Sequence, residues 1–244
     1  MADPAEDADE NLRRELDAPE EDAQIYEARG DEVDDLRPIC QGDVFGGLTL
    51  PGFDQRDHNM VLLSQHPCSL RKGAALRPRV QAVPVRTYRH VAPTLWATGH
   101  LRVFPLPDLD GSRHLAADLS EAGVITSEQL HSARRVFTLS QRGILLLQQR
   151  IVWTVAHTVI GLDVFEDYNA PALTEIELLE FWNEQLCGDE VDADRADALV
   201  VVAEEFESYI RDEGLQHALT KPDRLADARR TIRMEAIRRA EQRN

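Results

Sequence analysis

The chain has 244 residues and a formal net charge of −17, with 44 acidic and 27 basic residues. A protein whose main task is to grip nucleic-acid phosphates would rarely carry such a charge, because the duplex is itself a dense polyanion. The hydrophobic fraction of 43% is sufficient for a folded core, in one large domain or in one domain with an appendage.

The cysteines and the apolar stretches exclude several classes of protein. Cys40, Cys68 and Cys187 are far apart and odd in number, so they predict neither a disulfide framework nor a zinc site. The first residues are acidic and lack the apolar stretch of a signal peptide. The longest apolar run, residues 151–162, is too short and too polar to cross a bilayer. We therefore expect a cytoplasmic protein without a membrane segment.

The charge is distributed unevenly along the chain. Residues 1–37 carry a net charge of −11 and residues 163–220 carry −15, whereas residues 38–162 carry +5 and residues 221–244 carry +4. One interpretation is that the charge only keeps the protein soluble. The other is that the protein works through contacts with a basic protein partner and does not bind DNA tightly by itself.

Residues 1–36 are predicted to be an acidic disordered arm, because acidic residues, Ala and Pro dominate this stretch. From residue 37 the sequence alternates short apolar stretches with turn residues. The predicted strands span residues 43–45, 48–50, 59–64, 79–85, 97–106, 114–119 and 135–139. So many short strands favour a barrel over an open parallel sheet, and we assign residues 37–162 to this barrel.

The barrel is predicted to end in a long closing helix. Ser140 is a suitable N-cap for this helix, which we expect to reach about residue 160. Its apolar residues recur at steps of three or four and form a broad stripe. They are Ile144, Leu147, Ile151, Val155 and Val159, widened by Leu145, Leu146, Val152 and Trp153. A stripe of this breadth predicts that the helix is covered on more than one side.

A C-terminal helical region is predicted for residues 163–244, after a junction at residues 169–171. Thr174 and Glu177 have the spacing of a capping box at the start of one helix. Asp192 is a suitable cap for the next helix.

The last predicted helix, from Thr220 to the C-terminus, is the candidate partner-binding element. Its apolar seam is thin, and most of its other positions are Arg or Glu. A helix with so little apolar contact needs a partner, which is either its own helical neighbours or another protein. The candidate partner-binding residues are Leu225, Arg229, Arg230, Ile232, Arg233 and Arg238.

The densest polar cluster of the barrel surrounds His66 and Cys68, with Ser64 and Ser69 nearby. A nucleophilic cysteine needs a group that lowers its pKa, and no partner carboxylate stands near it in the sequence. A structural loop is therefore favoured over a thiol active site, and we assign no catalytic residue.

RNA cleavage without a metal would need a general base and a fixed cation. The candidate bases are His66, Asp43 and Glu121, and the candidate cations are Arg71, Lys72, Arg77, Arg79, Arg86 and Arg89. Basic residues beside a barrel are common, so this pattern alone is not specific. The eight histidines show neither HxH nor HExxH spacing, and the sequence has no phosphate-binding glycine loop. We expect neither a metal nor a cofactor.

Residues 38–160 resemble the PemK/MazF toxin family. The resemblance rests on Gly42-Asp43-Val44-Phe45, on Val61-Leu62-Leu63-Ser64, and on an arginine-rich strand that leads through Leu139-Ser140 into the closing helix. It implies an α+β fold with an SH3-like β-barrel and endoribonuclease activity. Two departures argue against that activity. Asp57-His58-Asn59-Met60 replaces the family's Arg-Pro, and only His66-Pro67-Cys68-Ser69 represents the segment that carries the family's chemistry.

The whole chain is similar to the recombination directionality factors that phages encode for large serine integrases. The similarity lies in the length, in the acidic Arg- and Ala-rich composition typical of high-GC actinobacterial phages, and in a compact domain followed by helices. It implies a non-enzymatic regulator in a bacterial host. Such a regulator binds the integrase, a basic DNA-bound recombinase, and switches it from integration to excision. The alternatives left open are a PemK/MazF-like endoribonuclease toxin and a scaffold or antitoxin-like protein without a link to DNA.

Overall fold

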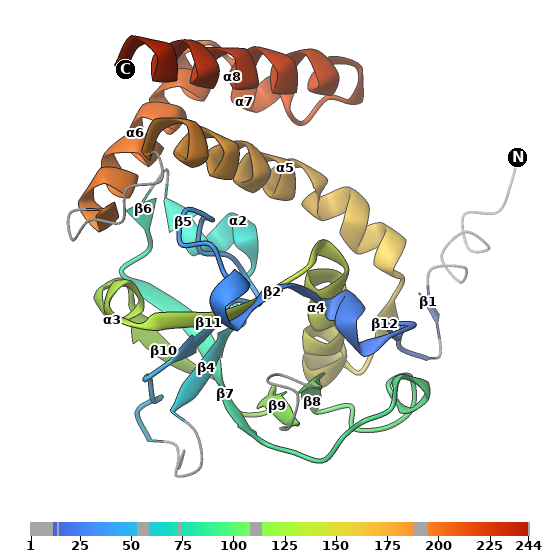
Figure 1. The fold of residues 1–244 in the computed structure, drawn as a ribbon. Helices are drawn as coiled ribbons and strands as arrows, with labels where there is room; N and C mark the ends of the chain where they lie inside the picture. Colours follow the sequence, from blue (N-terminus) through green and yellow to red (C-terminus); the bar gives the residue numbers. More distant parts are fainter. Residues whose placement is uncertain are drawn as a thin grey trace, which may run out of the picture. The chain divides into compact units, whose positions relative to one another are not determined.

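A computed structural model describes residues 12–13, 15–52, 59–72, 75–107, 114–187 and 195–243 (Figure 1). Internal contacts divide the chain into two compact units. Unit 1 comprises the described residues of 1–33, 41–66 and 78–168, and unit 2 comprises those of 34–40, 67–77 and 169–244. The predicted α+β class is confirmed, because a curled antiparallel sheet is combined with helices.

Unit 1 is built on this sheet. Among the described residues, its eight strands are β2 (Tyr26–Arg29), β3 (Val44–Gly46), β4 (Met60–Leu63), β7 (Arg79–Thr87), β8 (Val103–Leu106), β9 (Leu115–Asp118), β10 (Gly123–Thr126) and β11 (Arg134–Leu139). Their order is β2-β11-β3-β4-β7-β9-β8, and β10 also pairs with β7. Ala82 of β7 lies opposite both Leu63 of β4 and Gly123 of β10, so β7 is paired along both edges. The long strand β7 therefore joins the two halves of the sheet.

Two stretches predicted as strands differ in the structure. Residues 48–50 form no strand, because the amides of Gly47 and Leu48 both donate to the carbonyl oxygen of Asn59, at 2.7 and 3.2 Å. Residues 97–102 form turns, and only the end of the stretch 97–106 becomes strand β8. Leu48 and Leu50 are nevertheless buried, whereas Ala97 and Leu101 are only half-buried.

Helix α4 (Gln141–Ala156) is the central helix of unit 1 and begins where the sequence predicts. Ser140 caps it, because its hydroxyl accepts a hydrogen bond of 3.0 Å from the amide of Gly143. Residues 143–150 are buried, and the helix packs against β8, β11 and the 3-10 turn η1 (Asp22–Ile25). The helix ends earlier than predicted, because His157 takes a left-handed conformation with φ of 53°.

The second half of α4 is less covered than we expected. Ile151 to Thr154 are half-buried, and Val155 is 81% exposed. The prediction of cover on more than one side therefore holds for residues 143–150 and is wrong for the last two turns. Beyond the helix, β12 (Val159–Ile160) pairs with the short strand β1 (Leu12–Arg13).

The predicted disordered arm is wrong for residues 15–36, which are ordered. Strand β2 pairs with β11, and Ile25 is completely buried. The amide of Asp17 donates to Oε1 of Gln149 at 2.7 Å, and Nε2 of Gln149 donates to Oδ2 of Asp17 at 2.8 Å. The few apolar residues of this segment reach the core, and their burial outweighs the acidic composition. Residues 1–11 lie outside the described residues.

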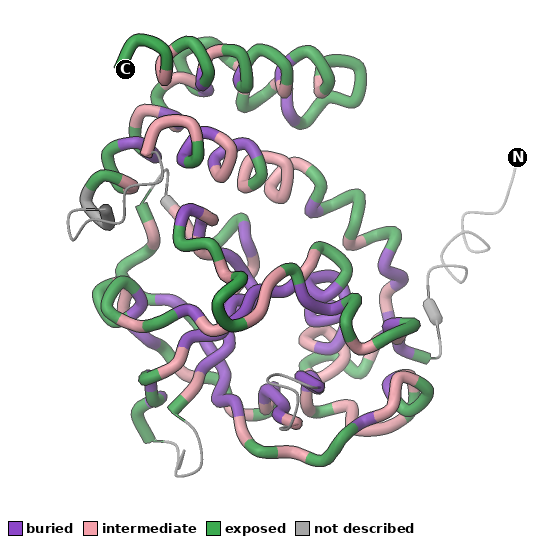
Figure 2. Tube along the Cα trace, in the orientation of Figure 1, coloured by how far each residue is buried: buried purple, intermediate pink, exposed green. Residues whose placement is uncertain are grey.

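Unit 2 is mainly helical. Its elements are α2 (Pro67–Leu70), β5 (Arg71–Lys72), β6 (Ala75–Leu76), the C-terminal part of α5 (Leu162–Cys187), α6 (Arg195–Asp212), α7 (Leu215–Ala218) and α8 (Pro222–Arg243). Its core is formed by buried residues of α5, α6 and α8, which appear as purple segments of these helices in Figure 2. Trp182 and Phe206 meet edge to face in this core, with ring centroids 5.6 Å apart.

The junction predicted at residues 169–171 coincides with the passage from unit 1 to unit 2, between Tyr168 and Asn169, but it does not break the helix, because α5 runs through it and carries Pro171 inside. The Thr174 and Glu177 pair therefore lies within a helix and caps nothing. A proline removes one helical hydrogen bond, and the apolar residues that α5 buries further along, such as Trp182, favour the continuous helix. Asp192, the predicted cap of the next helix, lies outside the described residues.

Candidate partner-binding face on helix α8

Helix α8 has an inner seam that belongs to the core of unit 2. Ala228, Ile232 and Ala236 recur every fourth residue, and Ile232 and Ala236 are completely buried. Leu225 packs against the same core and is half-buried. The assignment of Ile232 as a partner-binding residue is therefore wrong, because the side chain is enclosed by the neighbouring helices of its own unit. The sequence allowed two kinds of cover for the apolar seam, the neighbouring helices or another protein. The neighbouring helices of unit 2 cover it.

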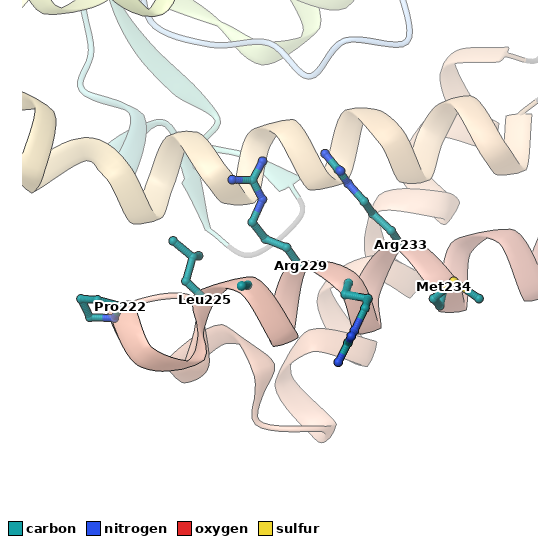
Figure 3. Close-up of a pocket in the computed structure, with 7 residues that line it drawn as sticks. Pro222, Leu225, Arg229, Arg233 and Met234 are labelled. Carbon is teal, nitrogen blue, oxygen red and sulfur yellow. The ribbon is translucent and has the colours of Figure 1, made fainter.

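A second face of α8 is open and forms a shallow pocket of about 580 Å³. Its lining residues are Pro222, Leu225, Ala226, Arg229, Arg230, Arg233 and Met234 (Figure 3). Met234 is 60% exposed, and Ile237, one turn further along the helix, is 36% exposed. The face thus combines exposed apolar side chains with three guanidinium groups.

The arginines of this face are held in place by carboxylates. In Figure 3, Arg229 and Arg233 both point toward helix α5. There each donates to Glu177, at 2.6 Å from Arg229 and at 2.7 Å from Arg233 to the same oxygen, Oε1. The guanidinium of Arg233 also lies 5.5 Å from the ring centre of Phe181. Arg230, on the solvent side, pairs with Asp227 at 2.9 Å.

The carboxylate of Glu177 therefore accepts hydrogen bonds from two guanidinium groups, those of Arg229 and Arg233. Among the residues that the structure describes, the three arginines of the pocket pair with two carboxylates, Glu177 and Asp227, so these ion pairs contain one positive charge in excess. The part of unit 2 that precedes α8 along the chain is strongly acidic in sequence, since residues 169–220 carry a net charge of −12. The open face of α8 is therefore a basic and apolar patch on a unit whose sequence is otherwise mostly acidic.

Arg238, the remaining predicted partner-binding residue, does not line this pocket. It donates to Glu235 at 2.6 and 2.7 Å, and Arg239 donates to the same carboxylate at 2.8 Å. The hydrogen bonds from Arg238 and Arg239 outweigh the opposing effect of partial burial and lower the pKa of Glu235 to about 2. Arg239 stacks over the ring of Trp182, 5.1 Å from its centre. This cluster fastens α8 within its own unit.

The sequence missed Pro222, Ala226 and Met234 as members of the open face. A signal was present, because residues 222, 226, 230 and 234 follow one another at steps of four and share one side of a helix. The apolar residues of the inner seam are more numerous, and Met234 stands among charged neighbours, so the spacing of the inner seam was the stronger of the two patterns.

The candidates for RNA cleavage are placed differently. Asp43 is completely buried and pairs with Arg135 at 3.2 Å, so it is not accessible to a substrate. Glu121 binds Arg86, so this candidate base and this candidate cation pair with each other. Arg77, Arg79 and Arg89 are exposed, and Arg71 is half-buried. The side chain of Lys72 lies outside what the structure describes.

His66 and Cys68 do not have the geometry of an activated thiol. The ring of His66 packs edge-on against Tyr168, with centroids 5.8 Å apart. Partial burial, together with the negative charge of Glu175, raises the pKa of the Cys68 thiol, against the effect of a backbone hydrogen bond. A raised pKa disfavours the thiolate, which is the nucleophilic form. The predicted loop is wrong from Pro67 onward, because Pro67–Leu70 form helix α2, and Cys68 lies within it.

Within the described part of the chain, no helix is long and apolar enough to span a bilayer. In the same residues, no three His, Cys, Asp or Glu side chains are grouped so that they could hold a metal ion.

Comparison of the sequence with protein-family models and with curated proteins finds no match.

Proposed function

We propose that this chain is a non-enzymatic protein-binding regulator, and specifically a recombination directionality factor that switches a large serine integrase from integration to excision. The observation that carries the binding role is the open face of α8, where Met234 is exposed among Arg229, Arg230 and Arg233. Exposed apolar side chains rimmed by arginines are typical of protein-binding surfaces. The length and composition of the chain, which are similar to those of directionality factors, support the choice of partner.

Unit 1 is proposed to be an SH3-like barrel of the PemK/MazF type. Its curled antiparallel sheet, its leading strand β3 after Gly42-Asp43, and the passage from β11 into the capped helix α4 support this assignment. On this proposal the barrel serves as a scaffold. The burial of Asp43 and the pairing of Glu121 with Arg86 favour the binding role over the endoribonuclease alternative.

The net charge of −17 suits a protein that meets its target on DNA without binding the DNA itself. A duplex is repelled by the acidic segments, whereas a basic recombinase is attracted by them, and complementary charge raises the rate of encounter. Exposed ion pairs contribute only about 0–1 kcal/mol each, so apolar contacts must supply most of the affinity. We place the protein in the cytoplasm of a bacterial host.

The test is recombination in vitro with the serine integrase encoded by the same phage genome. Addition of the protein should allow the integrase to recombine attL with attR, and should reduce recombination of attP with attB. The variant Met234→Glu should lose much of this effect, whereas Arg224→Glu, which is exposed on α8 but does not line the pocket, should keep it. An unchanged choice of sites in the presence of the protein would refute the proposed function.

The endoribonuclease alternative makes a separate prediction. Incubation of the purified protein with a long RNA should then yield fragments, and the variant His66→Ala should yield none. We expect no cleavage with either protein. Cleavage that depends on His66 would assign the barrel to the toxin class.

A further inference from the structure

The open face of α8 also indicates the chemistry of the segment that binds there. We propose that it docks an amphipathic helix of the partner protein, whose apolar side is flanked by Asp and Glu residues. This inference rests on the proposed protein-binding function and names the kind of partner segment that the face accepts.

The apolar part of the face has the repeat of a helix-binding surface. Pro222, Ala226 and Met234 lie on one side of α8, and Ile237 continues the row toward the C-terminus. A partner helix that lies along this row can insert side chains spaced by three and four residues. Met234 is unbranched and adaptable, so it can pack against such side chains without a rigid fit.

The charged part of the face selects acidic flanks. Within the described part of the chain, Arg229 and Arg233 share the carboxylate of Glu177, so two positive charges on that rim meet one negative charge. Arg230 stands between Ala226 and Met234 in the same row, and its side chain is 77% exposed although it pairs with Asp227. A carboxylate on the partner helix can bind these guanidinium groups in the bidentate manner that arginine favours. A lysine at the same place would meet like charge.

A nucleic acid fits this face less well than an acidic helix. None of the described residues that line the pocket is an aromatic one on which a base could stack. A duplex extends well beyond the face and would approach the acidic helices of unit 2, whereas a single helix covers only the local arginines. Salt screens the interactions between exposed charges that are more than about 8 Å apart. The binding of a short segment therefore depends mainly on the charges next to it. For an integrase that is basic overall, the docking segment is then distinct from the surface that holds DNA.

The experiment uses the full chain and a displayed library of helical peptides of about twenty residues. The apolar side of each peptide is fixed as Leu and Ala, and the flanking positions vary among Asp, Glu, Lys, Arg, Ser and Gln. Peptides selected on the wild-type protein are sequenced, and their affinities are measured by fluorescence anisotropy. The variants are Met234→Glu and Arg230→Glu, with Arg224→Glu as the matched control. Circular dichroism checks that each variant is folded.

We expect Asp and Glu to be enriched at the flanking positions. Met234→Glu and Arg230→Glu should weaken binding of the selected peptides by about tenfold or more, and Arg224→Glu should leave it nearly unchanged. Selection of neutral or basic flanks, no enrichment at all, or equal binding to Met234→Glu would overturn the proposal. Binding of a DNA duplex that is lost in Arg230→Glu would assign the face to nucleic acid instead.

The peptide experiment and the recombination assay test the two proposals independently, so a negative result in one does not decide the other. Acidic helices that bind α8 while the integrase is unaffected would refute the directionality function and leave the docking chemistry intact. Recombination that depends on Met234 while the selected helices are basic would leave the function intact and refute the acidic segment.

Discussion

The guanidinium group of Arg150 lies over the ring of Trp96, 5.0 Å from its centre, and donates to the backbone carbonyl of the same tryptophan at 2.6 Å. Arg150 also donates at 3.1 Å to the carbonyl oxygens of His100 and Val103. Burial lowers the pKa of Arg150 to about 10. One charged side chain of α4 thus holds the irregular stretch before β8 through hydrogen bonds to three backbone carbonyl oxygens.

Substitution Arg150→Met should destabilise unit 1 strongly. It keeps most of the side-chain volume but removes three hydrogen bonds, one to the buried carbonyl of Trp96 and two to the partly buried carbonyls of His100 and Val103, and hydrogen bonds to charged groups are among the stronger ones. We expect a loss of about 3–5 kcal/mol in the free energy of unfolding, measured by urea denaturation. The exposed Arg102→Ala is the control and should change stability by less than about 0.5 kcal/mol. Equal effects of the two variants would contradict this account of Arg150.

Gly143→Ala tests the attachment of the N-terminal segment to α4. A Cβ at position 143 would lie 2.2 Å from the carbonyl oxygen of Ile25, which is backbone and cannot yield easily. The clash should cost about 1–3 kcal/mol and so outweigh the gain of about 0.5–1 kcal/mol that alanine normally gives in a helix. Residues 15–33 should also become more sensitive to limited proteolysis.

The matched control for Gly143 is Gly46→Ala in strand β3. A Cβ at position 46 meets the side chain of Val136 at 3.7 Å, an ordinary contact. This variant should be close to wild type in both stability and proteolysis. If Gly143→Ala were equally harmless, the close approach of η1 to α4 would not be a feature of the folded protein.

Local patterns account for the elements that the sequence predicted correctly. Strand β4 is a continuous apolar run, and Val61, Leu62 and Leu63 are all completely buried, as expected for a central strand. Helix α4 begins at Ser140, because a hydroxyl there can accept from the first turn. These signals lie within a few residues of the element that they specify, so composition and spacing reveal them.

The elements that were missed depend on contacts distant in sequence. Strand β2 pairs with β11, more than a hundred residues away, and its four residues Tyr26–Arg29 stand in an acidic stretch that reads as disordered. The same holds for the binding face of α8. Its inner seam was visible as apolar spacing, but only the packing of α5 and α6 decides that Ile232 is enclosed and Met234 is not.

Ile232 and Met234 form a pair of tests on the same helix. Ile232→Ala should cost about 2–5 kcal/mol of stability, because it opens a cavity in the core of unit 2. Met234→Ala should change stability by less than about 0.5 kcal/mol and should reduce partner binding instead. Urea denaturation followed by circular dichroism separates the two effects from binding. A large loss of stability for Met234→Ala would show that the face is covered within the protein.

The acid sensitivity of α8 should depend on Glu235. Its pKa in the folded protein is lowered to about 2, first by the hydrogen bond from Arg238 and then by that from Arg239, from an ordinary value of 4.5. The folded state therefore favours the ionised form. The resulting stabilisation is fully present above about pH 4.5 and is lost as the pH falls toward about 2.

Glu235→Gln removes this ionisable group and should lower stability by about 1 kcal/mol near neutral pH, as expected for a half-exposed cluster of ion pairs. Because the wild-type carboxylate becomes protonated in acid, the difference between the two proteins should shrink when urea unfolding is repeated at lower pH. Glu241→Gln, exposed on the same helix, should show no such convergence. A difference between wild type and Glu235→Gln that stays constant down to about pH 2 would mean that the bonds from Arg238 and Arg239 do not stabilise the folded state.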